Sequence, residues 1–175
     1  MTKALFFAML VFLSSAANAG ILLDPYVGYI ISGNSNSGSG SKVTGNDLGV
    51  RLGYSNLGFG IGADVTFAGT YNYDASGTTT SGKPLHTGAF VSFALPILLR
   101  GYATYFVNTK VSDSNTAVTG KGTKLGVQYT GLPIVAIGVE VFTTNYSEIE
   151  ILGNKVSTSG TETQTRLAIS APFNF

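Results

Sequence analysis

The chain has 175 residues, with ten Lys or Arg, nine Asp or Glu, one His and no cysteine. Only 11% of it is charged and it has no basic cluster, which argues against a nucleic-acid partner, and the lack of cysteine excludes a disulfide-stabilised scaffold. Glycine is common, at 23 residues, and no apolar stripe with helical spacing follows residue 20, so we expect one all-β domain.

The first 19 residues are predicted to be a secretory signal peptide. Lys3 precedes an apolar run at 4–13, and the small-residue sequence Ala17-Asn18-Ala19 follows it. The run is about ten residues long, which is too short to cross a bilayer as a helix. We therefore expect export, cleavage after Ala19, and a single domain over residues 20–175.

Eight segments of alternating polarity follow, and each is predicted to be a strand. In chain order they cover 22–31, 47–54, 59–68, 85–95, 98–108, 123–130, 135–146 and 163–175. Short turns at 55–58, Pro96 and 131–133 alternate with four long polar connections. Short turns at one rim and long loops at the other are typical of outer-membrane barrels, in which an even strand number places both termini on the periplasmic side.

The two faces of these strands differ in size as well as polarity. In the second predicted strand Leu48, Val50 and Leu52 alternate with Gly49 and Arg51. Eight strands enclose only enough room for side chains, so the face with small residues is predicted to point inward and the apolar face to point at lipid. The glycines expected to make room inside are Gly49, Gly53, Gly60, Gly62, Gly88, Gly126 and Gly138.

Charged residues are concentrated on the same inner phase. All three arginines of the chain belong to it, and an unpaired charge in a narrow lumen would be costly, so we expect a paired structural network rather than a catalytic site. Its predicted members are Asp24, Arg51, Asp64, Arg100, Lys124, Glu140 and Arg166, with Asp47 beside them.

Aromatic residues on the outer phase gather near strand ends, as expected for rings at the two membrane interfaces. One ring is predicted beside the short turns, from Tyr54, Phe59, Phe93, Tyr129 and Phe175, and the other near the long loops, from Tyr29, Phe67, Tyr105 and Tyr146. The last strand is expected to stay regular to Phe175 and to pair with the first, because lipid cannot satisfy an open sheet edge.

The signal ending "ANA", the eight-segment meander and the closing "RLAISAPFNF" resemble the small outer-membrane barrels of Gram-negative bacteria, of the OmpA, OmpX and OmpW type. The resemblance implies an eight-stranded antiparallel up-and-down transmembrane β-barrel, surrounded by outer-membrane lipid and lipopolysaccharide, and present as a monomer. It also implies that Phe173 and Phe175 carry the terminal signal that the barrel-assembly machinery reads. The two-domain OmpA plan includes a peptidoglycan-binding domain after the barrel, and no such domain is expected after Phe175.

No cofactor, metal site or enzyme activity is expected. His86 lacks His or Cys partners for a metal and is interpreted as a polar rim residue. A lipid A deacylase would need a His-x-Ser pair, whereas Thr87 and Gly88 follow His86. The stretch at 33–42 does not match a phosphate-binding loop and is interpreted as a flexible loop.

Four functions are compatible with this pattern. The leading hypothesis is a structural or surface-interaction barrel with a plugged lumen and four long extracellular loops. The second is a narrow channel for small or hydrophobic solutes, which resemblance to the OmpW type would suggest. A lipid-modifying enzyme using His86 and a soluble lipocalin-like carrier are the others. The narrow channel of the second hypothesis would be lined by Tyr26, Phe90, Tyr102, Phe106 and Phe142.

Overall fold

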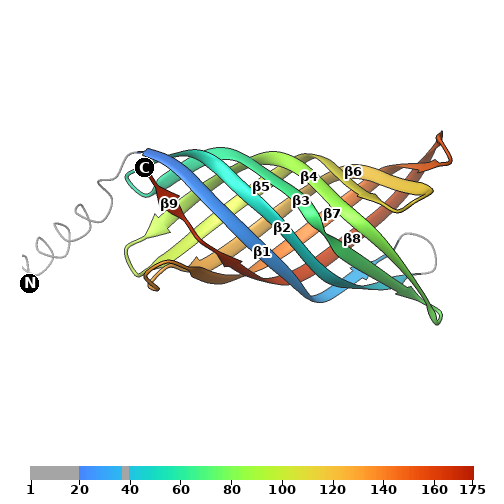
Figure 1. Cartoon of the computed structure of the whole chain (residues 1–175), viewed down its shortest axis with the longest axis horizontal. Coiled ribbons are helices and arrows are strands. Elements are labelled where there is room, and N and C mark those ends of the chain that lie inside the picture. Colours follow the sequence, from blue (N-terminus) through green and yellow to red (C-terminus); the bar gives the residue numbers. More distant parts are fainter. Residues whose placement is uncertain (1–19, 37–39) are drawn as a thin grey trace, which may run out of the picture.

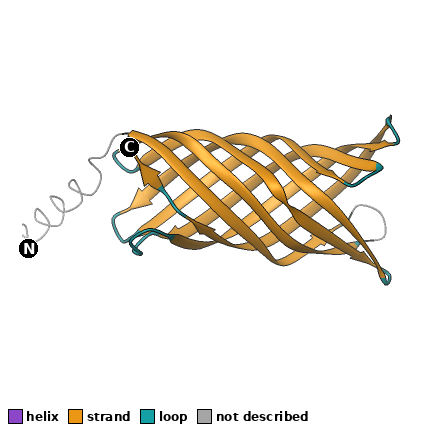
Figure 2. Cartoon of the chain, viewed as in Figure 1, coloured by secondary structure: helices purple, strands orange, loops and turns teal. Residues whose placement is uncertain are grey.

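The computed structural model describes residues 20–36 and 40–175, and the expected signal peptide lies outside them. Regular structure in the described residues consists of strands (Figure 2). The eight long strands are β1 (Gly20–Ser35), β2 (Ser41–Asn56), β3 (Phe59–Ala75), β4 (Thr78–Leu95), β5 (Leu99–Ser112), β6 (Thr116–Tyr129), β7 (Ala136–Ile151) and β8 (Asn154–Ser170), followed by the short β9 (Phe173–Asn174). The described residues include no helix of the length and hydropathy that a membrane crossing requires.

The strands form a closed antiparallel barrel. Each of the eight long strands pairs with its neighbour in sequence, and β1 pairs with both β2 and β8, which closes the sheet (Figure 1). The predicted eight-stranded up-and-down architecture is therefore confirmed. Closure satisfies the backbone groups of both edge strands, which an open sheet would expose.

The end of the chain completes this closure, although the predicted unbroken last strand is wrong. The strand stops at Ser170 and resumes as β9, because Pro172 has no backbone N–H to donate. Beyond the break, Leu23 pairs with Phe173, and Ile21 and Phe175 exchange two backbone hydrogen bonds of 3.0 Å.

The prediction of four long loops is also wrong. The segments at 70–75 and 78–84, for example, are paired strand joined by a two-residue turn at Ser76 and Gly77. Threonine and tyrosine fill these polar segments, and both residue types favour strands. Pairs of neighbouring strands therefore form long hairpins. At the end opposite the termini, these hairpins project beyond the apolar part of the wall (Figure 1). Residues 37–39 of the first connection lie outside the described residues.

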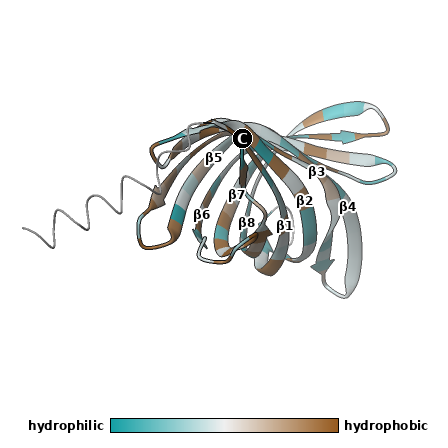
Figure 3. Cartoon of the chain, turned by 60° about the vertical axis from the view of Figure 1, so that its left-hand side comes forward, coloured by the Kyte–Doolittle hydropathy of each residue, from teal (hydrophilic) through white to brown (hydrophobic). Residues whose placement is uncertain are grey.

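Hydropathy alternates along each strand (Figure 3) because successive side chains point to opposite faces. The side chains that point outward include a band of large apolar residues, which we call the apolar belt. Its members are Ile21, Val27, Tyr29, Ile31, Leu48, Leu52, Tyr54, Phe59, Ile61, Phe67, Leu85, Val91, Phe93, Leu95, Tyr105, Val107, Leu125, Val127, Tyr129, Ile137, Val139, Val141, Leu167 and Ile169.

Candidate functional site in the barrel interior

The interior of the barrel is filled with ionic and aromatic side chains. The seven residues predicted to form the lumen network are all buried, none more than 7% exposed. Strand register brings several of them together, since Asp24 is paired with Arg51 and Arg51 with Asp64. Inward residues at the same height on adjacent strands can therefore form ion pairs without bending the backbone.

Arg51 is the centre of the larger cluster. Its guanidinium donates to Asp24 at 2.8 Å and to Glu140 at 2.9 Å, and its Nε lies 3.6 Å from Asp64. The same group is stacked between two rings, with its Cζ 4.6 Å from the centre of Tyr26 and 3.9 Å from that of Tyr102. A cation so enclosed has exchanged its hydration for three carboxylates and two aromatic faces.

The other cations of this cluster share the same carboxylates. Arg100 donates to Asp24 at 2.6 Å, so that one carboxylate serves two arginines. Lys124 lies 2.8 Å from Asp64, which also accepts hydrogen bonds from Tyr26 at 2.7 Å and Thr104 at 2.8 Å. Removing Asp24 would leave Arg100 without a counter-charge, and removing Asp64 would do the same to Lys124.

A second cluster lies nearer the mouth opposite the termini. Arg166 donates to Asp47 at 2.6 Å and, through its Nε, to Gln164 at 2.7 Å. Tyr71 donates to the same Asp47 oxygen at 2.6 Å and is itself bonded by Arg166. The Arg166 guanidinium also lies 4.4 Å from the centre of the Phe142 ring.

Glu162 belongs to this second cluster, although the sequence interpretation placed it in a loop. It is 1% exposed and accepts hydrogen bonds from Tyr146, at 3.0 Å, and from Gln164. The signal that was overlooked is alternation, because Glu162, Gln164 and Arg166 share one face of β8.

Two sequence-based placements are wrong. His86 is not a rim residue: it is 1% exposed and packs against the rings of Phe106 and Phe142, whose centres are 5.7 and 5.1 Å away. It was misplaced because the predicted strand starts at residue 85, whereas β4 already starts at Thr78. Tyr146 is not part of an outer aromatic ring but points inward, since it keeps the phase of Glu140 and the register shift of β7 comes only after it.

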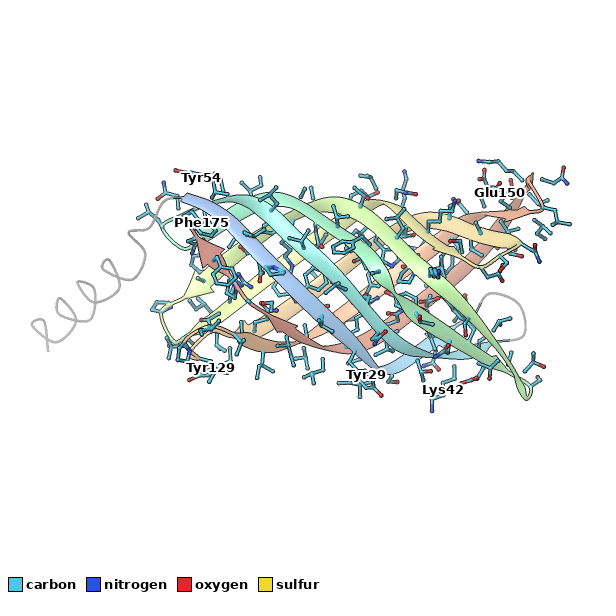
Figure 4. All side chains as sticks on the ribbon, viewed as in Figure 1. Tyr29, Lys42, Tyr54, Tyr129, Glu150 and Phe175 are labelled. Carbon is cyan, nitrogen blue, oxygen red and sulfur yellow. The ribbon has the colours of Figure 1, made fainter. Side chains whose placement is uncertain are left out.

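The remaining predicted ring residues point outward. Tyr54, Phe59, Phe93, Tyr129 and Phe175 are between 41% and 76% exposed, and Figure 4 shows Tyr54, Tyr129 and Phe175 at the end with the termini. Tyr29, Phe67 and Tyr105 are likewise half-exposed or more on the outer wall. No described set of three or more His, Asp or Glu side chains is arranged to hold a metal ion.

Several of the expected glycines do make room for the large side chains inside. A Cβ at Gly49 would lie 2.4 Å from the Tyr26 hydroxyl, and one at Gly126 would lie 2.3 Å from Cζ of Tyr102. Gly62 serves a different purpose, because a Cβ there would lie 2.2 Å from a backbone oxygen of the neighbouring strand. Small residues therefore set both the packing of the lumen and the close approach of the strands.

The mouth opposite the termini holds a cavity of about 320 Å³. Tyr73, Tyr146 and Val111 line it together with hydroxyl groups, including those of Thr80 and Ser112. Because Tyr146 bonds to Glu162, this cavity lies directly above the second cluster. The arrangement offers a recess with both hydroxyl and apolar lining at this mouth, above an interior occupied by side chains.

Comparisons with known proteins agree with the fold. The chain matches no protein-family model and no curated protein sequence. Among solved structures it is similar to Neisserial surface protein A, with a TM-score of 0.58 and 14% identity over 88% of this chain and 97% of that one. It is also similar to Ail of Yersinia pestis (TM-score 0.56, 12% identity, 88% and 99% covered) and to the outer membrane protein OprG of Pseudomonas aeruginosa (0.51, 11%, 91% and 99%). The fold of this chain is thus that of the small eight-stranded outer-membrane barrels.

Proposed function

We propose that the protein is an integral outer-membrane barrel with a structural or surface-interaction role, whose interior is sealed by the two ionic clusters. The carrying observation is the reversal of the usual distribution of side chains: the charged residues of the two clusters are buried inside, while the apolar belt covers the outer wall. Monomeric soluble proteins rarely expose apolar patches of that extent. Lipid is the solvent that such a wall requires.

The same proposal covers how the chain reaches the membrane and what it meets there. The segment 1–19 would direct export, and Phe173 and Phe175 at the closing seam would be read by the barrel-assembly machinery. Both aromatic side chains are exposed, at 41% and 76%, next to the point where β9 joins β1. Lipid and lipopolysaccharide would then surround the wall.

The long hairpins and the mouth cavity are the parts we assign to interaction outside the cell. Hydroxyl-bearing side chains dominate them, and no cofactor or catalytic group is assigned. His86 is enclosed by aromatic rings and Tyr71 rather than placed beside a substrate cleft, which supports a non-enzymatic role.

The proposal predicts that the folded barrel resists detergent. Complete strand pairing leaves no free edge at which unfolding can begin, so unboiled protein in detergent should migrate differently from boiled protein on a gel. The mature chain should also require detergent to stay in solution. A chain that is soluble without detergent would instead support the lipocalin-like carrier.

Conductance separates the sealed barrel from the channel. Tyr26, Tyr102 and Phe142, which could have lined a route through the lumen, are packed against Arg51 and Arg166. We therefore expect no reproducible conductance steps when the folded protein is added to a planar bilayer. Steady steps of uniform size would overturn the sealed interior and favour the narrow channel.

A further inference from the structure

The barrel end that carries both termini has an unusual surface, which we call the terminal rim: the turns at 57–58, 96–98 and 130–135, together with Phe175. Every turn in it exposes large apolar side chains. The exposed fractions are 57% for Leu57, 66% for Ile97, 50% for Leu98, 40% for Leu132, 67% for Ile134 and 76% for Phe175.

The terminal rim also lacks charged side chains. No Asp, Glu, Lys or Arg occurs in the segments 52–63, 89–99, 125–139 or 167–175, which include the turns and the strand ends that lead into them. The outer hairpin tips differ, since Asp113, Glu148, Glu150 and Lys155 lie on them. A rim that faced water would be expected to carry charge, as those tips do.

Backbone conformation does not separate the two ends of the barrel. Leu57 and Leu98 have positive φ angles of 50° and 61°, a conformation that favours Gly, Asn or Asp in a turn. Local backbone geometry therefore does not explain why leucine occupies these two positions. Leu152, on an outer tip, has the same strain with a φ of 50°, so strain alone does not distinguish the two ends.

The two ends of the barrel do differ in how far the apolar belt extends toward them. A strand tilted by about 45° advances roughly 2.3 Å across the membrane per residue, against an apolar band about 25 Å tall in proteins of this fold. On β3, the outward residues from Phe59 to Phe67 therefore cover about 20 Å. On β6, those from Leu125 to Tyr129 cover only about 10 Å, and Thr123 and Lys121 lie beyond them.

The missing height is supplied by the turns. A short apolar stretch, on β6, leads directly into the longest apolar turn, which holds Leu132, Ile134 and Val135. The adjoining strand β7 has Thr143 on its outer face beyond Val141, so its apolar stretch is short as well. The belt and the rim therefore form one continuous apolar surface, displaced toward the termini on this side of the barrel.

We propose that the terminal rim is immersed in lipid, in the interfacial layer of the leaflet on the side of the termini, and that lipid rather than a periplasmic protein is its partner. The inference rests on the proposed membrane location. Immersion covers the exposed Leu, Ile and Phe side chains of the turns and leaves the outer hairpins projecting further from the opposite surface.

Single-cysteine labelling tests the immersion. The chain has no cysteine, so Ile134→Cys and Ile97→Cys each give one unique site for an environment-sensitive fluorophore. The labelled full mature chain is reconstituted in phosphatidylcholine vesicles, with or without lipid brominated near the headgroup. Leu125→Cys in the belt and Ser76→Cys at an outer tip are the matched controls, and the gel-mobility shift verifies that each variant folds.

Immersion predicts that both rim labels show blue-shifted emission and lose intensity in brominated lipid, as the Leu125 label does, while the Ser76 label is unaffected. Rim labels that behave like the Ser76 label, beside a quenched Leu125 label, would overturn the immersion and leave the membrane barrel standing. An unquenched Leu125 label would show that the proposed membrane location itself fails.

Discussion

Replacing Arg51 with methionine is expected to lower the free energy of unfolding by about 3–5 kcal/mol, the range measured when one partner of a buried ion pair is removed. Methionine keeps much of the side-chain volume but removes the guanidinium that contacts Asp24, Asp64 and Glu140 together. Those carboxylates would remain inside the barrel with less positive charge to balance them. Urea titration of the protein folded in vesicles, followed by the gel-mobility shift, measures the change.

The matched control is Lys155→Met, which breaks an ion pair of similar length. Lys155 and Glu148 are 2.9 Å apart, but their side chains are 62% and 36% exposed. Solvent screening leaves such an exposed pair a much smaller contribution to stability than a buried one. Equal losses for the two variants would contradict a buried ionic network as the source of stability.

Arg51→Met combined with Glu140→Gln extends the test to the network. If Arg51 acts mainly by neutralising carboxylates, the double variant should be less destabilised than the sum of the two single variants, with a coupling energy of about 1 kcal/mol or more. Additive losses would indicate that Arg51 contributes through packing against Tyr26 and Tyr102 instead.

Alternation of small and large, polar and apolar residues is enough to predict which strand face lies inside. Arg51 and Gly49 share a phase on β2, and the narrowness of an eight-stranded barrel allows only the glycine-rich face to be concave. That argument needs no knowledge of pairing. It uses only the residues within one strand, which explains why it succeeds without knowledge of the strand register.

Contacts across the lumen could not be predicted in the same way. The contact of Arg100 with Asp24 joins β5 to β1, and that of Arg51 with Glu140 joins β2 to β7. Which heights face each other across a barrel depends on the stagger of all the strands, including the register shifts between Leu48 and Gly49 and between Thr87 and Gly88. Composition within one strand does not reveal these shifts.

The errors at the outer end have a common cause. His86, Tyr146 and Glu162 were judged from strand ends placed where apolar residues give way to Ser, Thr and Asn. In the structure the pairing continues through those polar segments, so the alternation that governs the strands of the apolar belt also governs them. Polarity marks where the apolar belt ends rather than where the strand ends.

Gly126→Ala is expected to cost about 3 kcal/mol, which is large for one added methyl group. The new Cβ would lie 2.3 Å from Cζ and 2.4 Å from the hydroxyl oxygen of Tyr102, so the ring would have to move. Tyr102 donates a hydrogen bond to Glu140 and stacks on Arg51, and both contacts would be displaced. Overpacking typically costs 1–3 kcal/mol and a hydrogen bond to a charged group about 1.5–3 kcal/mol, which together give the expected loss.

Gly101→Ala is the control, because a Cβ at Gly101 meets no heavy atom within 4 Å, and its loss should be small. A second comparison assigns the cause. In a Tyr102→Ala background the clash partner is gone, so Gly126→Ala should then change the free energy of unfolding by about 1 kcal/mol or less. An undiminished cost in that background would locate the effect in the strand backbone, and would mean that Gly126 is needed for close strand approach rather than to seat Tyr102 against the charged core of the barrel.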